Sequence, residues 1–348
     1  MRKLLIVVGA IVVLLAVGLW ALSTPDIPRA TLEAKYAKPP SEFLMLPDGA
    51  RAHVRDRGPR DAPALVLIHG SNASLFTWEP WAARLSGQWR VVSMDMPGHG
   101  LTGAVPNGDY SQEAMVRFTA EVADKLGLHR FALGGNSMGG GVAARFAEEH
   151  PNRVSALILV DAGGMPTREQ GSSIPLVFRI ARMPVVNQLL LHITPRSLVS
   201  EGLNDAIVRK NILTDQMIDQ YWDFARMTGT REATRARFAL PWNTAVADDI
   251  GKITAPTLIL WGDKDGLIPV EAAHRFHDAI KGSKLIIYPG TGHIPQEEVA
   301  DRSAKDVADF LTATLRPAEA APVPAQEGPM QQGPTATPPA EPLPVAPQ

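Results

Sequence analysis

The stretch Phe131-Ala132-Leu133-Gly134-Gly135-Asn136-Ser137-Met138-Gly139-Gly140-Gly141 is an apolar run that breaks into glycines around one serine, before a helical pattern resumes. This order predicts a strand, a sharp turn and a helix, with Ser137 at the apex. Gly135 and Gly139 flank the serine where the strand and helix backbones nearly touch, so only small residues fit there. The Met138 amide is left at a helix N-terminus, where its partial positive charge can stabilise an oxyanion. An idle serine in a glycine-rich turn would show the same five-residue pattern, so the rest of the chain has to distinguish the two.

Two loops later in the chain carry the residue types that activate a serine. A serine hydroxyl is a weak nucleophile near neutral pH and needs a histidine base held in one tautomer by a carboxylate. Residues 261–269 follow one apolar run and contain Asp263 and Asp265, and residues 290–298 follow the next and contain His293. Loops beyond the carboxyl ends of parallel strands converge on one crevice. We therefore expect the serine, an aspartate and the histidine to meet there.

The composition is that of a globular protein and narrows the range of partners. The chain has 348 residues and a formal net charge of -2, without a run of lysine and arginine, so a nucleic-acid partner is not expected. It has no cysteine, which excludes disulfides, thiolate metal sites and a cysteine nucleophile. The sequence also lacks a His-x-x-x-His pair, a carboxylate cluster with ligand spacing and a phosphate-binding loop. Neither a metal nor an organic cofactor is expected.

Both ends of the chain differ in composition from its middle. Arg2 and Lys3 precede an uncharged stretch over residues 4–22, which is about long enough to cross a bilayer as a helix and longer than the core of a signal peptide. It predicts an uncleaved membrane anchor with the rest of the chain outside the cytoplasm, in the periplasm of a bacterium; cleavage near Ser23 would give a secreted form instead. Residues 23–40 are interpreted as a tether, and the Pro/Ala-rich residues 317–348 as a disordered tail.

Between these ends, apolar runs alternate with helical patterns. A hairpin is predicted where residues 43–46 and 51–55 flank Pro47-Asp48-Gly49. Further strands are predicted at 64–68, 90–94, 156–160, 256–261 and 284–288, and helices at 77–85, 111–126, 271–280 and 297–315. Alternation of this kind implies a parallel sheet covered by helices on both faces. From about 163 to 250 the pattern is helical and interrupted by prolines, which predicts an inserted helical cap.

Five short segments, in this order, resemble the α/β-hydrolase superfamily over most of the chain. They are His69-Gly70, Asp95-Met96-Pro97-Gly98-His99-Gly100, the Gly-Asn-Ser-Met-Gly turn, Gly262-Asp263-Lys264-Asp265 with Pro269, and Gly292-His293 with two glutamates after it. The resemblance implies an α/β-hydrolase fold over residues 41–316, with a mostly parallel central sheet flanked by helices and an inserted helical cap. It also implies that Ser137 is the nucleophile, on the elbow between strand and helix.

The resemblance bears on the choice of carboxylate as well. Spacing alone leaves Asp263 and Asp265 as competitors for the role of orienting His293. Members of the family carry this acid four residues before the proline, which is Pro269 here, so the resemblance favours Asp265. Asp263 is then expected to shape the loop.

Two main-chain amides are needed to hold an oxyanion. Met138 follows the serine and supplies the first. Ser71, in the loop after the strand that ends at His69-Gly70, is expected to supply the second, with Asn72 as the alternative. The side chains of His69 and His99 are expected to shape loops, as these motifs do in the family.

The predicted cap contains aromatic and cationic residues that suit a binding pocket. The apolar candidates for its underside are Phe178, Met183, Trp222, Phe224 and Trp242. At helical spacing such residues also form ordinary core. Arg179 and Arg182 suit either a substrate carboxylate or a solvated basic face.

These features together predict a serine hydrolase that cleaves a small to medium, partly apolar carboxylic ester through an acyl-enzyme. A first alternative is carbon–carbon bond hydrolysis of a ring-cleavage diketone, because the Ser137 turn also resembles that branch of the family. That branch commonly has a tryptophan after the catalytic histidine, where this chain has Ile294. A cofactor-free haloperoxidase or perhydrolase shares the same three residues, and a non-catalytic binding protein on this fold is the alternative from another functional class.

Overall fold

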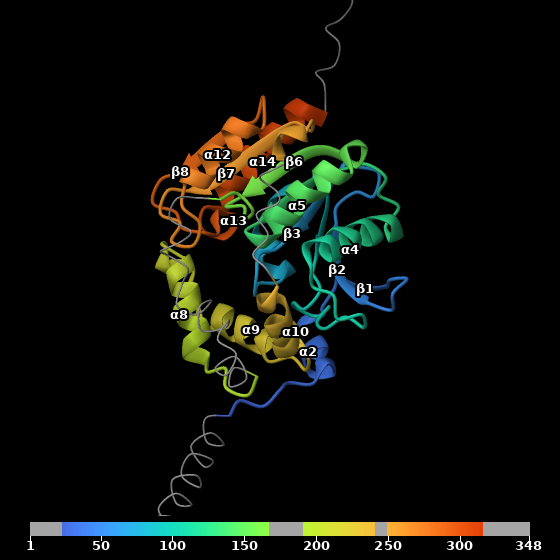
Figure 1. The fold of residues 1–348 in the computed structure, drawn as a ribbon, viewed down its shortest axis with the longest axis vertical. Coiled ribbons are helices and arrows are strands. Elements are labelled where there is room, and N and C mark those ends of the chain that lie inside the picture. Colours follow the sequence, from blue (N-terminus) through green and yellow to red (C-terminus); the bar gives the residue numbers. More distant parts are fainter. Residues whose placement is uncertain (1–22, 167–190, 241–248, 316–348) are drawn as a thin grey trace, which may run out of the picture.

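The computed structural model describes residues 23–166, 191–240 and 249–315 (Figure 1). Within these ranges no helix is both long and apolar enough to cross a membrane. The predicted anchor at 4–22 and the predicted tail at 317–348 lie outside the described residues. So do five residues expected in the cap, which are Phe178, Arg179, Arg182, Met183 and Trp242.

An eight-stranded, mostly parallel sheet forms the centre of the molecule, in the order β1-β2-β4-β3-β5-β6-β7-β8. The second strand runs antiparallel to both of its neighbours, and the remaining pairs are parallel. The strands are β1 Ser41–Met45, β2 Arg51–Arg57, β3 Ala64–Ile68, β4 Arg90–Met94, β5 Phe131–Asn136, β6 Val154–Val160, β7 Thr257–Gly262 and β8 Lys284–Tyr288. The predicted fold class is confirmed.

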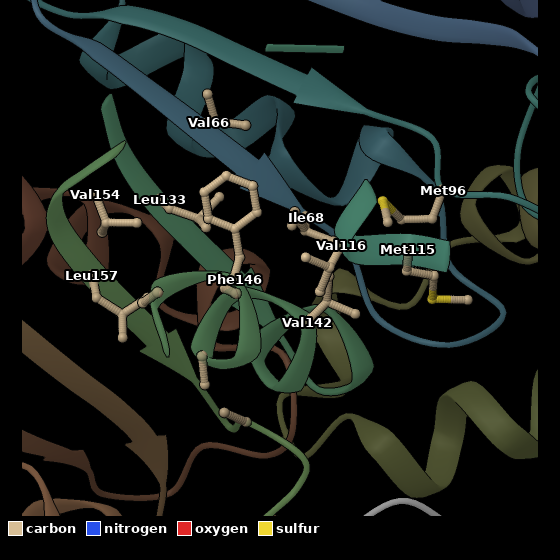
Figure 2. Packing of buried hydrophobic residues seen from close by; sticks show 14 of the residues in the cluster. Val66, Ile68, Met96, Met115, Val116, Leu133, Val142, Phe146, Val154 and Leu157 are labelled. Carbon is tan, nitrogen blue, oxygen red and sulfur yellow. The ribbon is translucent and has the colours of Figure 1, made fainter. Parts of the chain in front are cut away.

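Helices cover both faces of this sheet, so its central strands are apolar on both sides. In β3, Val66 and Ile68 lie on the sheet face that α4, α5 and α12 cover, whereas Leu65 and Leu67 lie on the face that α3 and α14 cover. Figure 2 shows Val66, Ile68 and Leu133 of the sheet beside Phe146 of α5. These helices are α3 Glu79–Leu85, α4 Gln112–Lys125, α5 Met138–Glu149, α12 Glu271–Ala279 and α14 Ala300–Leu315.

Helix α5 begins at Met138, directly after the serine, and its first turn contains the glycines that interrupt the apolar pattern. One predicted helix differs from the structure. The predicted helix at 297–315 is broken at Val299 into α13 Pro295–Glu298 and α14. The short α13 follows the His293 loop, so the break lies next to the candidate site.

The predicted cap region is helical where the structure describes it. Helices α8 Arg196–Ala206, α9 Asp215–Ala225 and α10 Thr230–Ala239 lie together over the end of the sheet at which β5 and β8 terminate (Figure 1). Apolar residues of α8 and α9 pack against the His293 loop, where Leu203, Ile218 and the neighbouring Ile207 form a cluster with Ile294.

Part of the predicted tether is a packed helix instead. Helix α2 Arg29–Tyr36 lies beside the cap, and its Leu32 is 1% exposed in a cluster with Leu101, Phe224 and Met227. The Arg29 guanidinium donates to the Leu101 and Thr102 carbonyls at 2.7 Å each. With only two large apolar residues, four positions apart, this helix carries a weak sequence pattern, and its stability comes from these tertiary contacts.

Leu32→Ala should therefore lower the free energy of unfolding by about 2–5 kcal/mol, the range found for buried leucines. Thr31→Ala, on the exposed side of the same helix, should change it by less than about 0.5 kcal/mol. Urea denaturation of both variants measures the difference. Equal, negligible effects would mean that residues 23–40 are a free tether after all.

Candidate functional site

Ser137 lies at the apex of a strained turn between β5 and α5. Its φ is 54° and its ψ is -121°, a conformation that non-glycine residues rarely adopt. The Ser137 amide donates to the Val160 carbonyl at 3.0 Å, which ties the turn to the neighbouring strand. A Cβ added at Gly135 would lie 2.1 Å from the Gly139 carbonyl oxygen, so glycine is required there. The strand-turn-helix arrangement predicted for this stretch is present.

Two hydrogen bonds hold the main chain of His293. Its own amide donates to the Ala206 carbonyl of the cap at 2.8 Å, and its carbonyl accepts from the Asn136 amide group at 3.0 Å. Asn136 directly precedes Ser137, so one side chain links the histidine loop to the serine turn. The His293 residue is 5% exposed.

Glu298 fixes the same loop from α13. One carboxylate oxygen accepts from the Gly292 amide at 2.8 Å, and the other accepts from the Val208 and Arg209 amides at 2.9 and 2.8 Å. The carboxylate therefore joins the histidine loop to the segment that follows α8. Sequence analysis includes this glutamate in the motif around His293 but predicts no role for it.

Asp265 is the carboxylate that reaches the histidine. Its Oδ2 lies 2.7 Å from His293 Nδ1, and its Oδ1 accepts from the Leu267 and Ile268 amides at 2.8 and 3.1 Å. This bond assigns the ring proton to Nδ1 and leaves the Nε2 lone pair free to accept a proton. Asp263 instead accepts from the Gly290 amide at 2.6 Å and holds the turn before the histidine.

Asp161, at the end of β6, is a fourth member of the site that the sequence did not identify. It is fully buried at a φ of 43°, and one carboxyl oxygen accepts from the Gly262 amide at 3.0 Å. The other oxygen meets no N–H or O–H donor among the described residues. Polar atoms of Asp161, Asp265 and His293 lie within 4.8 Å of one another. The only sequence signal was an aspartate directly after a buried apolar strand.

Two carboxyl groups facing each other in a buried site cannot both be ionised. Burial and, next, the charge of Asp265 raise the pKa of the Asp161 carboxyl well above its ordinary range. The Asp161 carboxyl therefore keeps its proton to a higher pH than an exposed aspartate does, and while protonated it can donate to Asp265. Although the three side chains could in principle hold a cation, their atoms are already committed to one another, and the arrangement is that of a hydrogen-bonded row.

The loop after β3 passes close to the serine. A Cβ added at Gly70 would lie 3.1 Å from the Cβ of Ser137, so the following residue, Ser71, borders the nucleophile turn. Asn72 has a φ of 58°, which turns the chain away again. Across the described chain, the Ser71 and Met138 amides donate to no other residue. Both N–H groups are thus available to a ligand.

His69 and His99 shape these loops from buried positions. His69 Nδ1 donates to the Gly70 carbonyl at 2.7 Å, and its Nε2 accepts from the Met96 amide at 3.0 Å. His99 Nδ1 donates to the Pro97 carbonyl at 2.9 Å. Burial lowers the pKa of both imidazoles, so they remain neutral.

A mainly apolar cavity of about 290 Å³ connects these groups beneath the cap. Ser71, Ser137 and His293 line its floor. The cap contributes Leu198, Val199, Leu203, Tyr221, Phe224 and Phe238. Of the described aromatic residues expected there, Phe224 lines the cavity, whereas Trp222 donates its indole N–H to the Thr194 carbonyl at 2.7 Å.

Residues 63–300 match the family model described as alpha/beta hydrolase fold. An uncharacterized protein of Mycobacterium bovis is 31% identical over 294 residues, which cover 81% of this chain and 84% of that protein. The 2-hydroxy-6-oxononadienedioate/2-hydroxy-6-oxononatrienedioate hydrolase of Klebsiella pneumoniae is 29% identical over 282 residues, covering 78% and 95%.

Two solved structures share the fold at lower identity. A bacterial membrane phospholipase A superposes with a TM-score of 0.67 at 24% identity, covering 91% of this chain and all of that one. The meta-cleavage product hydrolase CumD of Pseudomonas fluorescens gives a TM-score of 0.67 at 23% identity, covering 78% and 97%.

The protonated state of Asp161 can be tested through stability. Above a pH of about 3.9 an unfolded aspartate ionises, whereas the buried Asp161 keeps its proton, so the folded state binds one proton more. As the pH rises, the ionisation of Asp161 in the unfolded state therefore lowers the wild-type free energy of unfolding by about 1.4 kcal/mol per pH unit, until the pH reaches the raised pKa of the folded state. Asp161→Asn cannot titrate, and its amide can still accept from Gly262 and donate to Asp265. Urea unfolding from pH 4.5 to 7 should show the stability of the variant rising relative to wild type, and a pH-independent difference would contradict the assignment.

Proposed function

The chain belongs to the α/β-hydrolase family, and from this premise we propose that it hydrolyses a small to medium, partly apolar carboxylic ester through an acyl-enzyme on Ser137. The observation that carries the proposal is the convergence of Ser137 and the His293–Asp265 pair on one apolar cavity. The family assignment makes the chain a hydrolase. The proposal concerns which bond is cleaved and which residues cleave it.

In the proposed acylation step, Ser137 Oγ attacks the ester carbonyl carbon while His293 Nε2 takes the hydroxyl proton. The Nδ1–H bond to Asp265 stabilises the imidazolium that forms. The amides of Ser71 and Met138 donate to the oxyanion of the tetrahedral intermediate. As that intermediate collapses, the bond to the alcohol oxygen breaks and His293 returns its proton to the leaving alcohol.

Deacylation repeats these steps with water as the nucleophile. His293 removes a proton from water, the hydroxide attacks the acyl carbon, and Ser137 leaves with the proton held by the imidazolium. The apolar residues of α8, α9 and α10 offer a surface for the hydrocarbon part of the substrate. The cavity volume suits an acyl or alkoxy group of modest size.

Carbon–carbon bond hydrolysis remains the second candidate, because the Klebsiella relative is named as a hydrolase of 2-hydroxy-6-oxo dienedioates. Ile294, 7% exposed next to His293, packs with Leu203 and Ile218 of the cap where that branch commonly has tryptophan. Parallel assays with p-nitrophenyl esters and a 2-hydroxy-6-oxo dienoate separate the two candidates. Faster turnover of the dienoate would favour the second.

A membrane location is also part of the proposal. The apolar stretch at 4–22 and the two basic residues before it support an anchor with the hydrolase domain outside the cytoplasm. A reporter fused after Gln348 should be active only if it is a type that works outside the cytoplasm. Activity of a cytoplasmic reporter would contradict this orientation.

The nucleophile is tested by Ser137→Ala. The change removes one oxygen beside glycines, so the variant should fold while losing labelling by a fluorophosphonate and nearly all turnover of p-nitrophenyl butyrate. His293→Ala should fall to a similar level, and the double variant should be little worse than either, because the nucleophile and base act as one unit. Wild-type turnover in Ser137→Ala would overturn the proposal.

The two nearby aspartates make a matched pair of variants. Asp265→Asn should lower kcat on the order of ten-thousand-fold, because the amide cannot stabilise the imidazolium and favours the wrong tautomer. Asp263→Asn, which alters only a contact to the Gly290 amide, should lower it far less. Steady-state kinetics at saturating ester gives both values, and the reverse ranking would move the acid to Asp263.

A further inference from the structure

An arginine of the cap reaches the two residues whose amides border the nucleophile. Arg237, near the end of α10, donates through Nη1 to Ser71 Oγ, and the same nitrogen lies 3.7 Å from Met138 Sδ. Its Nη2 donates to Asn72 Oδ1 at 2.8 Å. One guanidinium group therefore bridges the β3 loop and the first residue of α5. No sequence pattern pointed to this residue.

No described carboxylate balances the charge of this guanidinium. Within the described ranges Arg237 forms no ion pair, in contrast to Arg231 on the same helix, which lies 3.5 Å from Asp26. Burial lowers the pKa of Arg237 to about 10, which still leaves it charged near neutral pH. Its positive charge also acts, after burial, to lower the pKa of His99. The field of Arg237 therefore reaches the loops around the site.

A partly buried cation without a carboxylate partner, as Arg237 is among the described residues, costs free energy unless something compensates for its charge. The hydrogen bonds to Ser71 and Asn72 satisfy donors of the guanidinium but do not neutralise its charge. A negative charge that develops beside Ser71 and Met138 would neutralise it. The oxyanion of the proposed ester hydrolysis develops at this position.

We propose that Arg237 is a positioning residue for the oxyanion hole: it fixes the Ser71 loop from the cap and adds positive charge beside the oxyanion. The inference rests on the proposed function, since it needs an oxyanion at Ser137. The cap then supplies part of the transition-state stabilisation, so the oxyanion hole is complete only while α10 packs against the β3 loop. The competing role for such a residue is to bind a carboxylate of the substrate.

The test uses Arg237→Gln, Arg237→Met and Arg237→Lys in the full chain. The Gln and Met variants remove the charge, and the Met variant keeps an apolar stem against Phe238, whose ring centroid lies 4.7 Å from the guanidinium carbon. Both should lower kcat for a neutral p-nitrophenyl ester about 10- to 100-fold, which is less than the loss of about 100- to 1,000-fold that follows removal of a direct oxyanion donor, while KM changes less than about twofold. Arg237→Lys, which keeps the charge, should stay within about threefold of wild type.

A second readout does not depend on finding a good ester. The rate of Ser137 labelling by a fluorophosphonate depends on the nucleophile and on stabilisation of the phosphonyl oxygen, so it should fall in the Gln and Met variants and recover in the Lys variant. Arg275→Gln removes one positive charge from α12, where Arg275 pairs with Glu271, and should label within about twofold of wild type. Thermal melts establish that each variant is folded.

Three results would contradict the role of Arg237 and leave the proposed ester hydrolysis intact. The first is an unchanged labelling rate in Arg237→Gln, and the second is a labelling rate that falls as far in Arg237→Lys as in Arg237→Gln. The third is a KM that rises in Arg237→Gln for anionic esters only, with kcat unchanged. The last of these would make Arg237 a substrate-binding residue instead. Absence of Ser137 labelling in the wild-type protein would overturn the proposed function itself, and this inference with it.

Discussion

The close approach of β5 to α5 at Ser137 is the constraint on which the rest of the structure depends. The two backbones leave no room for a Cβ at Gly135, and the serine between them is held in a left-handed conformation. Such strain persists only where surrounding contacts maintain it, and here the Val160 carbonyl and the following helix do so. The hydroxyl is thereby presented at the carboxyl end of β5, on the same side of the sheet as the loops that follow β3, β7 and β8.

The remaining parts of the site are arranged as rows of hydrogen bonds that begin at the His293 loop. One row passes from His293 to Asp265 and then to Asp161, each on a loop after a different strand. Another ties the histidine loop to the cap through Glu298. Because the cap supplies main-chain partners to this loop, its packing and the geometry of the proposed catalytic base are physically linked.

The sequence predicted what depends on local pattern and missed what depends on tertiary contact. The strands at 64–68 and 90–94 were predicted to the residue, because fully buried strands are short apolar runs bounded by polar ones. The Asp265–His293 contact was anticipated from the resemblance to the family, because spacing alone left Asp263 as a competitor. Helix α2, Asp161 and Arg237 were not, since each derives its role from residues distant in the chain. A tether with one buried leucine, an aspartate after a strand and an arginine on a charged helix look ordinary in isolation.

The central claim is that an acyl group of the substrate is transferred to Ser137 and then to water. The most direct measurement is mass spectrometry of the wild-type protein, quenched in acid during turnover of a p-nitrophenyl ester and digested for peptide mapping. The account predicts one added acyl group, located on Ser137 and absent when the ester is omitted. Rapid ester turnover without an acylated peptide, or acylation at another residue, would contradict it.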